Sequence, residues 1–369
     1  MKVADVAREL EAIAPLDLAA EWDNVGLLVG DRQGSVEKLM LCVDLTEAVL
    51  AEAVSAKAQM VMAYHPVIFK TISRVTADAA PVVYAAARRG LAVYSMHTAL
   101  DSAPGGTNDV LAEVLGLVGA RPLEAAHDHH RCKIVVFVPA NDLANVAEAA
   151  FAAGAGRIGE YQDCAFFSHG IGTFVAGRAA QPTVGRPGQH EAVEEVRFEA
   201  IAPIARVADV AMAIRAAHSY EEPAIDVYRL EHLPDACGMG RIGRLNEPVD
   251  ESALVERIKT ATGLKQVWIA RAASKSPSHG PITVAACAAG SAGGMFEAAA
   301  SGGATFYLTG EMRHHDALAA NAAGLTVACL GHSNSERLTL QHLAKRLRKR
   351  ISDLKVAVSK KDADPFEIV

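Results

Sequence analysis

Histidines and carboxylates of this sequence gather at the points where short apolar runs end. Each of four such runs, which we predict to be buried strands, is followed within a few residues by a side chain that can bind a metal ion. These side chains are His65, His97, Asp101, Glu311, His332 and Glu336. Because sites in open α/β sheets form beyond the carboxyl ends of the strands, we expect residues distant in sequence to converge there.

The residue types indicate a divalent metal and hydrolytic chemistry. Imidazoles combined with carboxylates suit Zn, Mn, Fe or Mg, and no nearby pair of cysteines indicates a closed structural zinc site. His332 and Glu336 are four residues apart, so both lie on one face of a helix that starts near Ser333. Carboxylates such as Asp101 and Glu336 can also bridge two ions about 3.5 to 4 Å apart, with a bridging hydroxide as the nucleophile.

Each residue also has a purely structural interpretation. A histidine at a strand end is more often a hydrogen-bonded boundary residue than a ligand, and Glu336 can be a first-turn carboxylate that faces the helix dipole. His314 and His315 are adjacent on a predicted helix, so at most one of them faces a cleft. The run 127–130, with three histidines, is expected to be a solvated linker.

The elements that must position these residues alternate between strands and helices in both outer thirds of the chain, which predicts an α/β fold. Strands are expected at 38–43, 59–63, 91–96, 282–287, 305–308 and 325–330, and helices at 46–57, 81–89, 313–322 and 335–350. The middle third instead has the order β-α-β-β-α-β of a ferredoxin-like α+β domain, with a long exposed hairpin loop over 178–190. The prediction is a split α/β domain, 1–128 and 246–369, interrupted by an inserted domain at 129–245.

Composition excludes several classes of protein. The 369 residues carry a net charge of -7, with 51% hydrophobic and 21% charged residues, which disfavours binding of nucleic acid by broad electrostatic attraction. No secretory signal and no membrane-spanning run is expected. The six cysteines are scattered without a Cys-x-x-Cys pair, so we expect buried thiols in a reducing cytoplasm.

An ordered set of motifs resembles the NIF-three-like dinuclear-metal hexamer family, whose members are also labelled GTP cyclohydrolase I type 2 homologues. The motifs are EWDNVGLLVG at 21–30, YHPVIF at 64–69, HTALD at 97–101, GGTND at 105–109, YLTGEMRHHD at 307–316 and GHSNSE at 331–336. The middle third resembles the PII-like or CutA-like insert of the longer bacterial members. The segments that carry this likeness are VEEVRFEAIAP at 193–203, AHSYEEPAIDVY at 217–228 and GMGRIG at 238–243.

The resemblance implies a ring-shaped homohexamer with a two-metal site in each subunit. The family's ligand pattern, carried onto this sequence, assigns the metal to His65, Asp101, His332 and Glu336. Tyr64 stands where the family's usual pattern has a further histidine, and a phenol with a pKa of about 10 is a poor ligand. We therefore expect one firmly bound ion, with a second that is weaker or assisted by Tyr64, His97 or a water.

The reaction that the resemblance implies is hydrolysis of a nucleotide or related small molecule by metal-activated water, with His97 or Glu311 transferring protons. The family label points to the purine ring of GTP, opened by water with release of formate, although neither G-x-x-x-x-G-K-[ST] nor G-x-G-x-x-G after a strand is present. Two alternatives stay open. One is a regulatory module whose insert senses a small ligand, and the other is a metal store or chaperone.

Overall fold

The computed structural model describes residues 1–126, 131–158, 161–230, 237–272 and 280–367. The chain divides into two units, of which the first joins Met1–Ala126 to Pro234–Val369 and the second is His127–Leu233. This second unit ends before the boundary at 245 that the sequence suggested, because residues 241–249 form a strand of the first unit. The run 127–130, predicted to be a linker, lies outside the described residues.

A five-stranded sheet forms one half of the first unit, with the strand order β1-β4-β3-β2-β17. Four of its strands are parallel and β1 pairs antiparallel to β4. The strands are β1 (Gly26–Val29), β2 (Lys38–Cys42), β3 (Met60–Ala63), β4 (Ala92–Ser95) and β17 (Lys355–Val358).

Apolar residues occupy both faces of this sheet because helices cover both sides. One face packs against α1 (Val3–Glu11) and α11 (His332–Arg350), and the other packs against α2 (Glu47–Ser55) and α3 (Pro81–Arg88). Two-sided burial explains why β3 reads as a continuous apolar run rather than an alternating one.

A six-stranded sheet forms the other half of the first unit, with the order β13-β16-β15-β14-β12-β5. Its three central strands, β14 to β16, are parallel. The strands are β5 (Leu117–Arg121), β12 (Arg241–Val249), β13 (Trp268–Ala270), β14 (Ile282–Ala288), β15 (Phe306–Thr309) and β16 (Thr326–Cys329), and β6 (Glu124–Ala125) pairs with β11 (Gly238–Met239). Helices α5 (Thr107–Leu115) and α8 (Glu251–Thr262) cover one face, and α9 (Phe296–Ser301) and α10 (His314–Ala322) cover the other.

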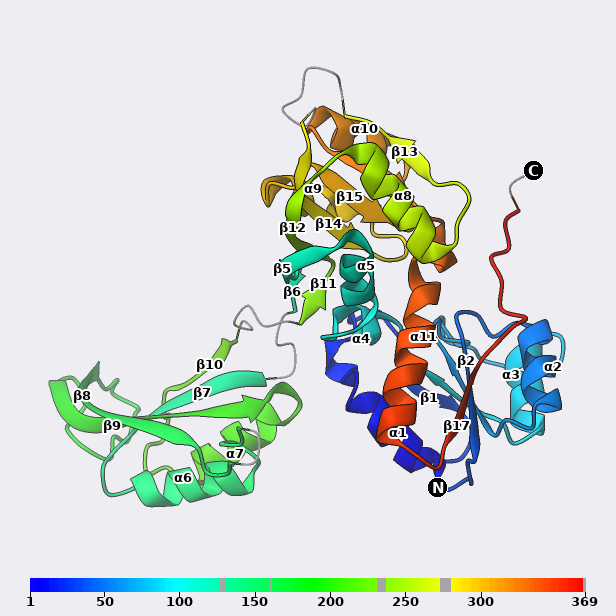
Figure 1. The fold of residues 1–369 in the computed structure, drawn as a ribbon. Helices are drawn as coiled ribbons and strands as arrows, with labels where there is room; N and C mark the ends of the chain where they lie inside the picture. The colour runs from blue at the N-terminus through cyan, green and yellow to red at the C-terminus, as the bar shows by residue number, and fades with distance from the viewer. Residues whose placement is uncertain (127–130, 159–160, 231–236, 273–279, 368–369) are drawn as a thin grey trace. The chain divides into compact units, whose positions relative to one another are not determined.

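Helix α11 links the two sheets of this unit (Figure 1). It starts directly after β16 of the six-stranded sheet, and its later turns bury Leu340, Leu343 and Leu347 in the core of the five-stranded sheet. Its first residue is His332, three residues earlier than the helix predicted over 335–350. The first turn therefore lies at the carboxyl ends of strands from one sheet while the body of the helix is anchored on the other.

The second unit is a four-stranded antiparallel sheet in the order β10-β7-β9-β8, with helices on one face. Its elements are β7 (Arg131–Val138), α6 (Leu143–Ala152), β8 (Ala165–Val175), β9 (His190–Pro203), α7 (Val207–Ala217) and β10 (Ile225–Arg229). This is the β-α-β-β-α-β order that the sequence predicted, and the connection between β8 and β9 spans 176–189.

The mixed α/β class predicted from the sequence is confirmed, and the predicted strands and helices of the outer thirds form with shifts of a few residues at their ends. Among the residues that the structure describes, no helix combines the length and apolar character needed to cross a membrane.

A buried ion pair ties β12 to α5. Arg241 is 1% exposed, and its guanidinium donates Nε to Asp109 Oδ1 at 2.6 Å and Nη2 to Oδ2 at 2.9 Å. Its Nη1 donates to the carbonyl oxygens of Gly238 and Gly240, both at 2.7 Å. Two parallel bonds to one carboxylate are the strong geometry for arginine, and the added carbonyl contacts satisfy the buried nitrogen.

We predict that Arg241→Ala lowers the free energy of unfolding by about 3 to 5 kcal/mol, because it leaves a carboxylate without its buried partner. Arg8→Ala is the control, since the Arg8 guanidinium pairs with Asp5 at the surface and its loss should cost less than about 1 kcal/mol. Urea denaturation of both variants measures the difference. Equal effects of the two substitutions would contradict the structural role of Arg241.

Candidate metal centre

Three side chains from two distant segments converge beside the first turn of α11. His65, His332 and Glu336 offer one ligand atom each, and these atoms lie within 4.8 Å of one another. His65 follows β3, where its backbone nitrogen donates to the carbonyl of Val43, and the other two residues lie one turn apart on α11. The spacing of four residues places both α11 side chains on one face, as the sequence predicted.

The distances match the geometry of ligands around one ion. His65 Nε2 lies 3.3 Å from Glu336 Oε2, and His332 Nε2 lies 3.4 Å from Glu336 Oε1. Ligand atoms placed tetrahedrally around zinc at about 2.0 to 2.1 Å are separated by about 3.3 to 3.4 Å. The two histidine–glutamate distances, each to a different oxygen of the carboxylate, are therefore those of neighbouring metal ligands, and three protein ligands leave a position for water.

His65 Nε2 and Glu336 Oε2 are buried 3.3 Å from each other, yet within the described part of the chain neither atom makes a hydrogen bond of normal geometry. Glu336 is 2% exposed. A buried carboxylate without a donor is costly, and a cation between it and the imidazole removes that cost. The donor set and these two atoms fit a divalent metal.

Carboxylates hold both imidazoles in the orientation that metal binding needs. His65 Nδ1 bonds Asp44 Oδ1 at 2.9 Å, and His332 Nδ1 bonds Glu311 Oε1 at 3.0 Å. Each Nδ1–H donates to its carboxylate, which directs the lone pair of Nε2 toward Glu336. These bonds also lower the pKa of Asp44 and the pKa of Glu311 below their usual values. Glu311 thus lies where it orients His332.

The electrostatics of the centre favour positive charge. Burial by itself lowers the pKa of His65, but the hydrogen bond to Asp44 and the charge of Glu336 outweigh it and raise that pKa to about 10. Burial and the charge of Glu336 raise the pKa of Asp101 to about 6. The carboxylates at this centre outnumber the cationic groups and repel one another, and a bound divalent ion would reduce that repulsion.

Tyr64 and Asp101 bind each other beside the group of three. Tyr64 is fully buried, and its hydroxyl donates to Asp101 Oδ1 and lies 3.0 Å from Thr107 Oγ1. Burial and the charges of Asp101 and Glu336 raise the pKa of Tyr64 well above its usual value, so its hydroxyl stays protonated. Asp101 lies in α4 (His97–Ser102) and is not one of the three grouped ligand residues.

His97 lies against the same centre, with its ring centroid 5.3 Å from that of His65. Its Nδ1 bonds Asp23 Oδ1 at 2.8 Å, and Asp23 also accepts the backbone nitrogen of Thr98 at 3.1 Å. Burial raises the pKa of Asp23, yet the hydrogen bonds from His97 and Thr98 outweigh it and lower that pKa. Asp23 thereby fixes the His97 tautomer that leaves Nε2 able to accept a proton.

Glycine makes room for the Glu336 carboxylate. Gly290 follows β14 with a φ of +66°, and a Cβ atom there would lie 2.9 Å from Glu336 Oε1. Its backbone nitrogen donates to Ser335 Oγ at 2.8 Å, and Ser335 Oγ donates to the carbonyl of His332 at 2.6 Å. The first turn of α11 is therefore fixed to the end of β14 at close range.

Asp44 and Asp23 are the functional residues that sequence reasoning missed. Asp44 follows the predicted strand at 38–43, so it carried the same signal as His65, and Asp23 lies inside the EWDNVGLLVG motif. Neither could be assigned a partner from sequence, because the histidines that they orient lie 21 and 74 residues away.

We predict that Asp44→Asn and Glu311→Gln each weaken zinc binding about 10- to 100-fold, because each substitution releases the orientation of one imidazole. Glu297→Gln, at an exposed carboxylate of α9, is the matched control and should leave the affinity unchanged. Competition with a chromophoric chelator measures all three. Affinities of the first two variants within two-fold of wild type would refute the orienting role.

We also predict that zinc binding at pH 7 releases about one proton from His65. A group with a pKa of about 10 is protonated at pH 7, and the metal needs its neutral form, so the affinity should fall as the pH is lowered from 9 to 7. Calorimetric titrations in two buffers with different ionisation enthalpies measure the proton count. Identical heats in both buffers would show that no proton leaves.

Comparison with known proteins identifies the family to which the chain is similar. A family model described as Duf34/NIF3 (NGG1p interacting factor 3) matches residues 1–365. Proteins named "GTP cyclohydrolase 1 type 2 homolog" are 33% identical in Listeria monocytogenes, with 100% of both chains covered, and 33% identical in Bacillus subtilis, with 96% of this chain and 95% of the relative covered.

Solved structures agree with the sequence relatives. The Bacillus cereus protein related to NIF3 has a TM-score of 0.68 and 32% identity over 100% of this chain and 99% of its own. The fold is also similar to that of Staphylococcus aureus SA1388, with a TM-score of 0.78 and 24% identity over 100% and 99% of the two chains. The chain belongs to the Duf34/NIF3 family.

Proposed function

We propose that the chain binds a divalent metal ion through His65, His332 and Glu336 and hydrolyses a small molecule beside it. The observation that carries this proposal is the orientation of two imidazoles, each held at Nδ1 by a carboxylate and each presenting Nε2 to the buried Glu336. Two histidines, one glutamate and an open position form a ligand set that hydrolytic zinc sites use.

The ion, once bound, supplies a Lewis acid that lowers the pKa of a coordinated water to about 7. The residues of the chain orient the metal ligands, leave access for the substrate and take up a proton. Asp44 and Glu311 keep both imidazoles in place, and His332 is 38% exposed at the side chain, so substrate can approach from that side. His97 Nε2 takes up a proton while Asp23 stabilises the resulting imidazolium.

The substrate that we propose carries a flat heteroaromatic ring, as a nucleotide does. Trp22 and Phe69 are 63% and 51% exposed, and their ring centroids lie 5.9 Å apart. Both rings also contact His97, at 5.9 Å and 6.2 Å between centroids. Exposed rings beside a polar centre offer stacking, which is worth about 1 to 3 kcal/mol per base. The relatives' name, with its reference to GTP, supports the same substrate class.

Turnover distinguishes this proposal from the two alternatives. Incubation of zinc-loaded protein with GTP should release formate, and Trp22→Ala should raise KM more than it lowers kcat if Trp22 stacks on the ring. Exchange of metal with a chelator without any turnover would favour a metal store or chaperone, and ligand-dependent change in the second unit would favour a regulatory module.

We further propose that six chains form a ring-shaped homohexamer, which family membership supports. Light scattering should then give six times the chain mass of 38.8 kDa, and the mass of one chain would remove the proposal. We also propose a cytoplasmic location, which the free thiols of Cys42, Cys164, Cys287 and Cys329 support because thiols stay reduced there.

The Tyr64–Asp101 hydrogen bond predicts one ion per chain rather than two. Tyr64 engages the carboxylate that a second ion would need, so wild type should bind about one zinc and His332→Ala should lose it. Tyr64→His, which adds an imidazole and releases Asp101, should raise the count to about two. Elemental analysis of the purified proteins measures the ratio.

Tyr94→His is the control for that experiment, because Tyr94 is also buried but its hydroxyl donates to Glu11 rather than to Asp101. It should leave the count at about one. A wild-type count near zero after incubation with Zn, Mn or Fe would contradict metal binding itself. A count of two in wild type would contradict the prediction that the bond from Tyr64 to Asp101 prevents binding of a second ion.

A further inference from the structure

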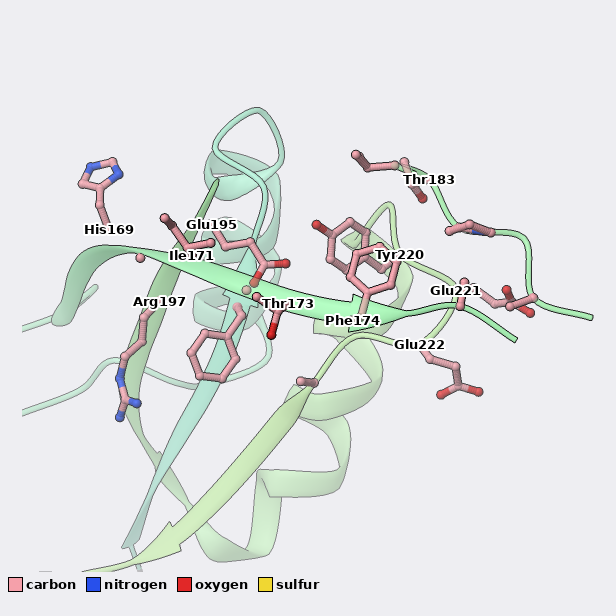
Figure 2. Close-up of a pocket in the computed structure, with 18 of the residues that line it drawn as sticks. His169, Ile171, Thr173, Phe174, Thr183, Glu195, Arg197, Tyr220, Glu221 and Glu222 are labelled. Atoms are coloured by element: carbon pink, nitrogen blue, oxygen red, sulfur yellow. The ribbon is translucent and has the colours of Figure 1, made fainter. Parts of the chain in front are cut away.

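The second unit contains a cleft of its own, separate from the metal centre in sequence and in fold. Its volume is about 660 Å³, which is within the usual range of small-molecule sites. Along β9, Val196 is buried and Phe198 packs in the core beneath α6 and α7, so Glu195 and Arg197 alternate to the opposite face of the sheet. The cleft lies over that uncovered face (Figure 2).

Two glycines of β8 open the floor of the cleft to the Glu195 carboxylate. Gly170 is the cross-strand partner of Glu195, and a Cβ atom at Gly170 would meet nothing within 4 Å. A Cβ atom at Gly172 would lie 2.1 Å from Glu195 Oε2. The carboxylate therefore occupies space that any other residue at Gly172 would fill, and Figure 2 shows it projecting into the centre of the site.

Aromatic rings line the cleft around this carboxylate, contributed by Phe137, Phe174 and Tyr220. The Arg197 guanidinium already lies 5.9 Å from the centroid of the Phe137 ring, so one ring of the site contacts a cation. The hydroxyl of Tyr220 is buried and interacts with the Glu195 carboxylate, although it makes no hydrogen bond of normal geometry among the described residues. Burial and the Glu195 charge raise the pKa of Tyr220, so the hydroxyl stays neutral.

The charge that the cleft presents is negative. Arg197 is paired with Glu199, whose Oε2 accepts Nε at 3.1 Å and Nη2 at 3.0 Å and whose Oε1 accepts Lys133 Nζ at 2.7 Å, so these three groups carry one net positive charge against the three carboxylates of Glu195, Glu221 and Glu222. Glu195 remains half-buried in the cleft, and Glu221 and Glu222 lie at its mouth. The backbone nitrogen of Gln181 donates to Glu221 Oε2 at 3.0 Å, which fastens the β8–β9 loop to the loop before β10.

We propose that this cleft binds a small organic cation with an apolar body, its ammonium or guanidinium group against Glu195 and its carbon skeleton against the three rings. An anion would meet the carboxylates of Glu195, Glu221 and Glu222, whereas the Arg197 guanidinium already binds Glu199. A bare metal ion would find one half-buried carboxylate where it needs three or more ligands, and no metal-ligand group is found here in the described part of the chain. This inference goes beyond the proposed hydrolysis and does not depend on it.

The test uses three soluble probes that share one skeleton: phenethylammonium, 2-phenylethanol and phenylacetate. Calorimetric titration of the full chain should show the cation binding at least ten-fold more tightly than the neutral or anionic probe. Glu195→Gln should weaken binding of the cation at least ten-fold and reduce the preference between the probes. Gly172→Val, which fills the space of the carboxylate, should have a similar effect.

Glu194→Gln is the matched control, because Glu194 is exposed on the same strand and faces the other side of the sheet. It should change the affinity less than two-fold, and circular dichroism of all variants checks that the fold is kept. Equal binding of phenylacetate, equal effects at Glu194 and Glu195, or no binding of phenethylammonium at millimolar concentration would overturn the proposal. A change of oligomer mass in Glu195→Gln without cation binding would assign the cleft to contacts between chains instead.

Discussion

The carboxylate of Glu336 is buried between two imidazoles, and the arrangement around it determines much of the first unit. A buried charge needs a compensating partner, which is protonated His65 in the metal-free chain and would be the proposed ion, held by His65 and His332 as well, once metal is bound. Their contacts to Asp44 and Glu311 add negative charge at the outer side of each ring, which strengthens the demand for positive charge at the centre. Stability and function are coupled here, since a metal that binds the folded chain also stabilises it.

The fold brings the ligand residues together by placing the strand ends of two different sheets next to each other. His65 leaves a strand of the five-stranded sheet, whereas α11 starts from a strand of the six-stranded sheet and is anchored in the core of the other. A small shift of either sheet would separate His65 from Glu336. The buried pair of Arg241 and Asp109 and the close approach at Gly290 resist such shifts on the side of the six-stranded sheet.

Much of this could be predicted from sequence, for a physical reason. His65, His332 and Glu336 follow apolar runs whose length and composition identify buried strands, and the i, i+4 spacing on α11 needs no tertiary information. The order of elements in the second unit could be derived in the same way from its apolar periodicity.

Other features depend on which side chains face each other after folding. The bond from Tyr64 to Asp101 joins residues 37 positions apart, and the contact of Glu311 with His332, which gives Glu311 an orienting position, joins residues 21 positions apart. The cleft of the second unit needs Glu195 opposite Gly170 and one pair away from Gly172 on the neighbouring strand, which no local pattern encodes. The helix start at His332 is one residue from the Ser333 that the ligand spacing indicated but three residues before the predicted range 335–350, because Gly331, with a φ of +92°, ends the preceding loop without a typical capping side chain.

The most direct test of the account is anomalous diffraction from crystals grown with zinc, measured on both sides of the zinc absorption edge. The account predicts one strong peak per chain, at about 2.0 to 2.2 Å from Nε2 of His65, Nε2 of His332 and a carboxylate oxygen of Glu336. A peak elsewhere, or a peak that contacts only one of these residues, would contradict the assignment of the centre.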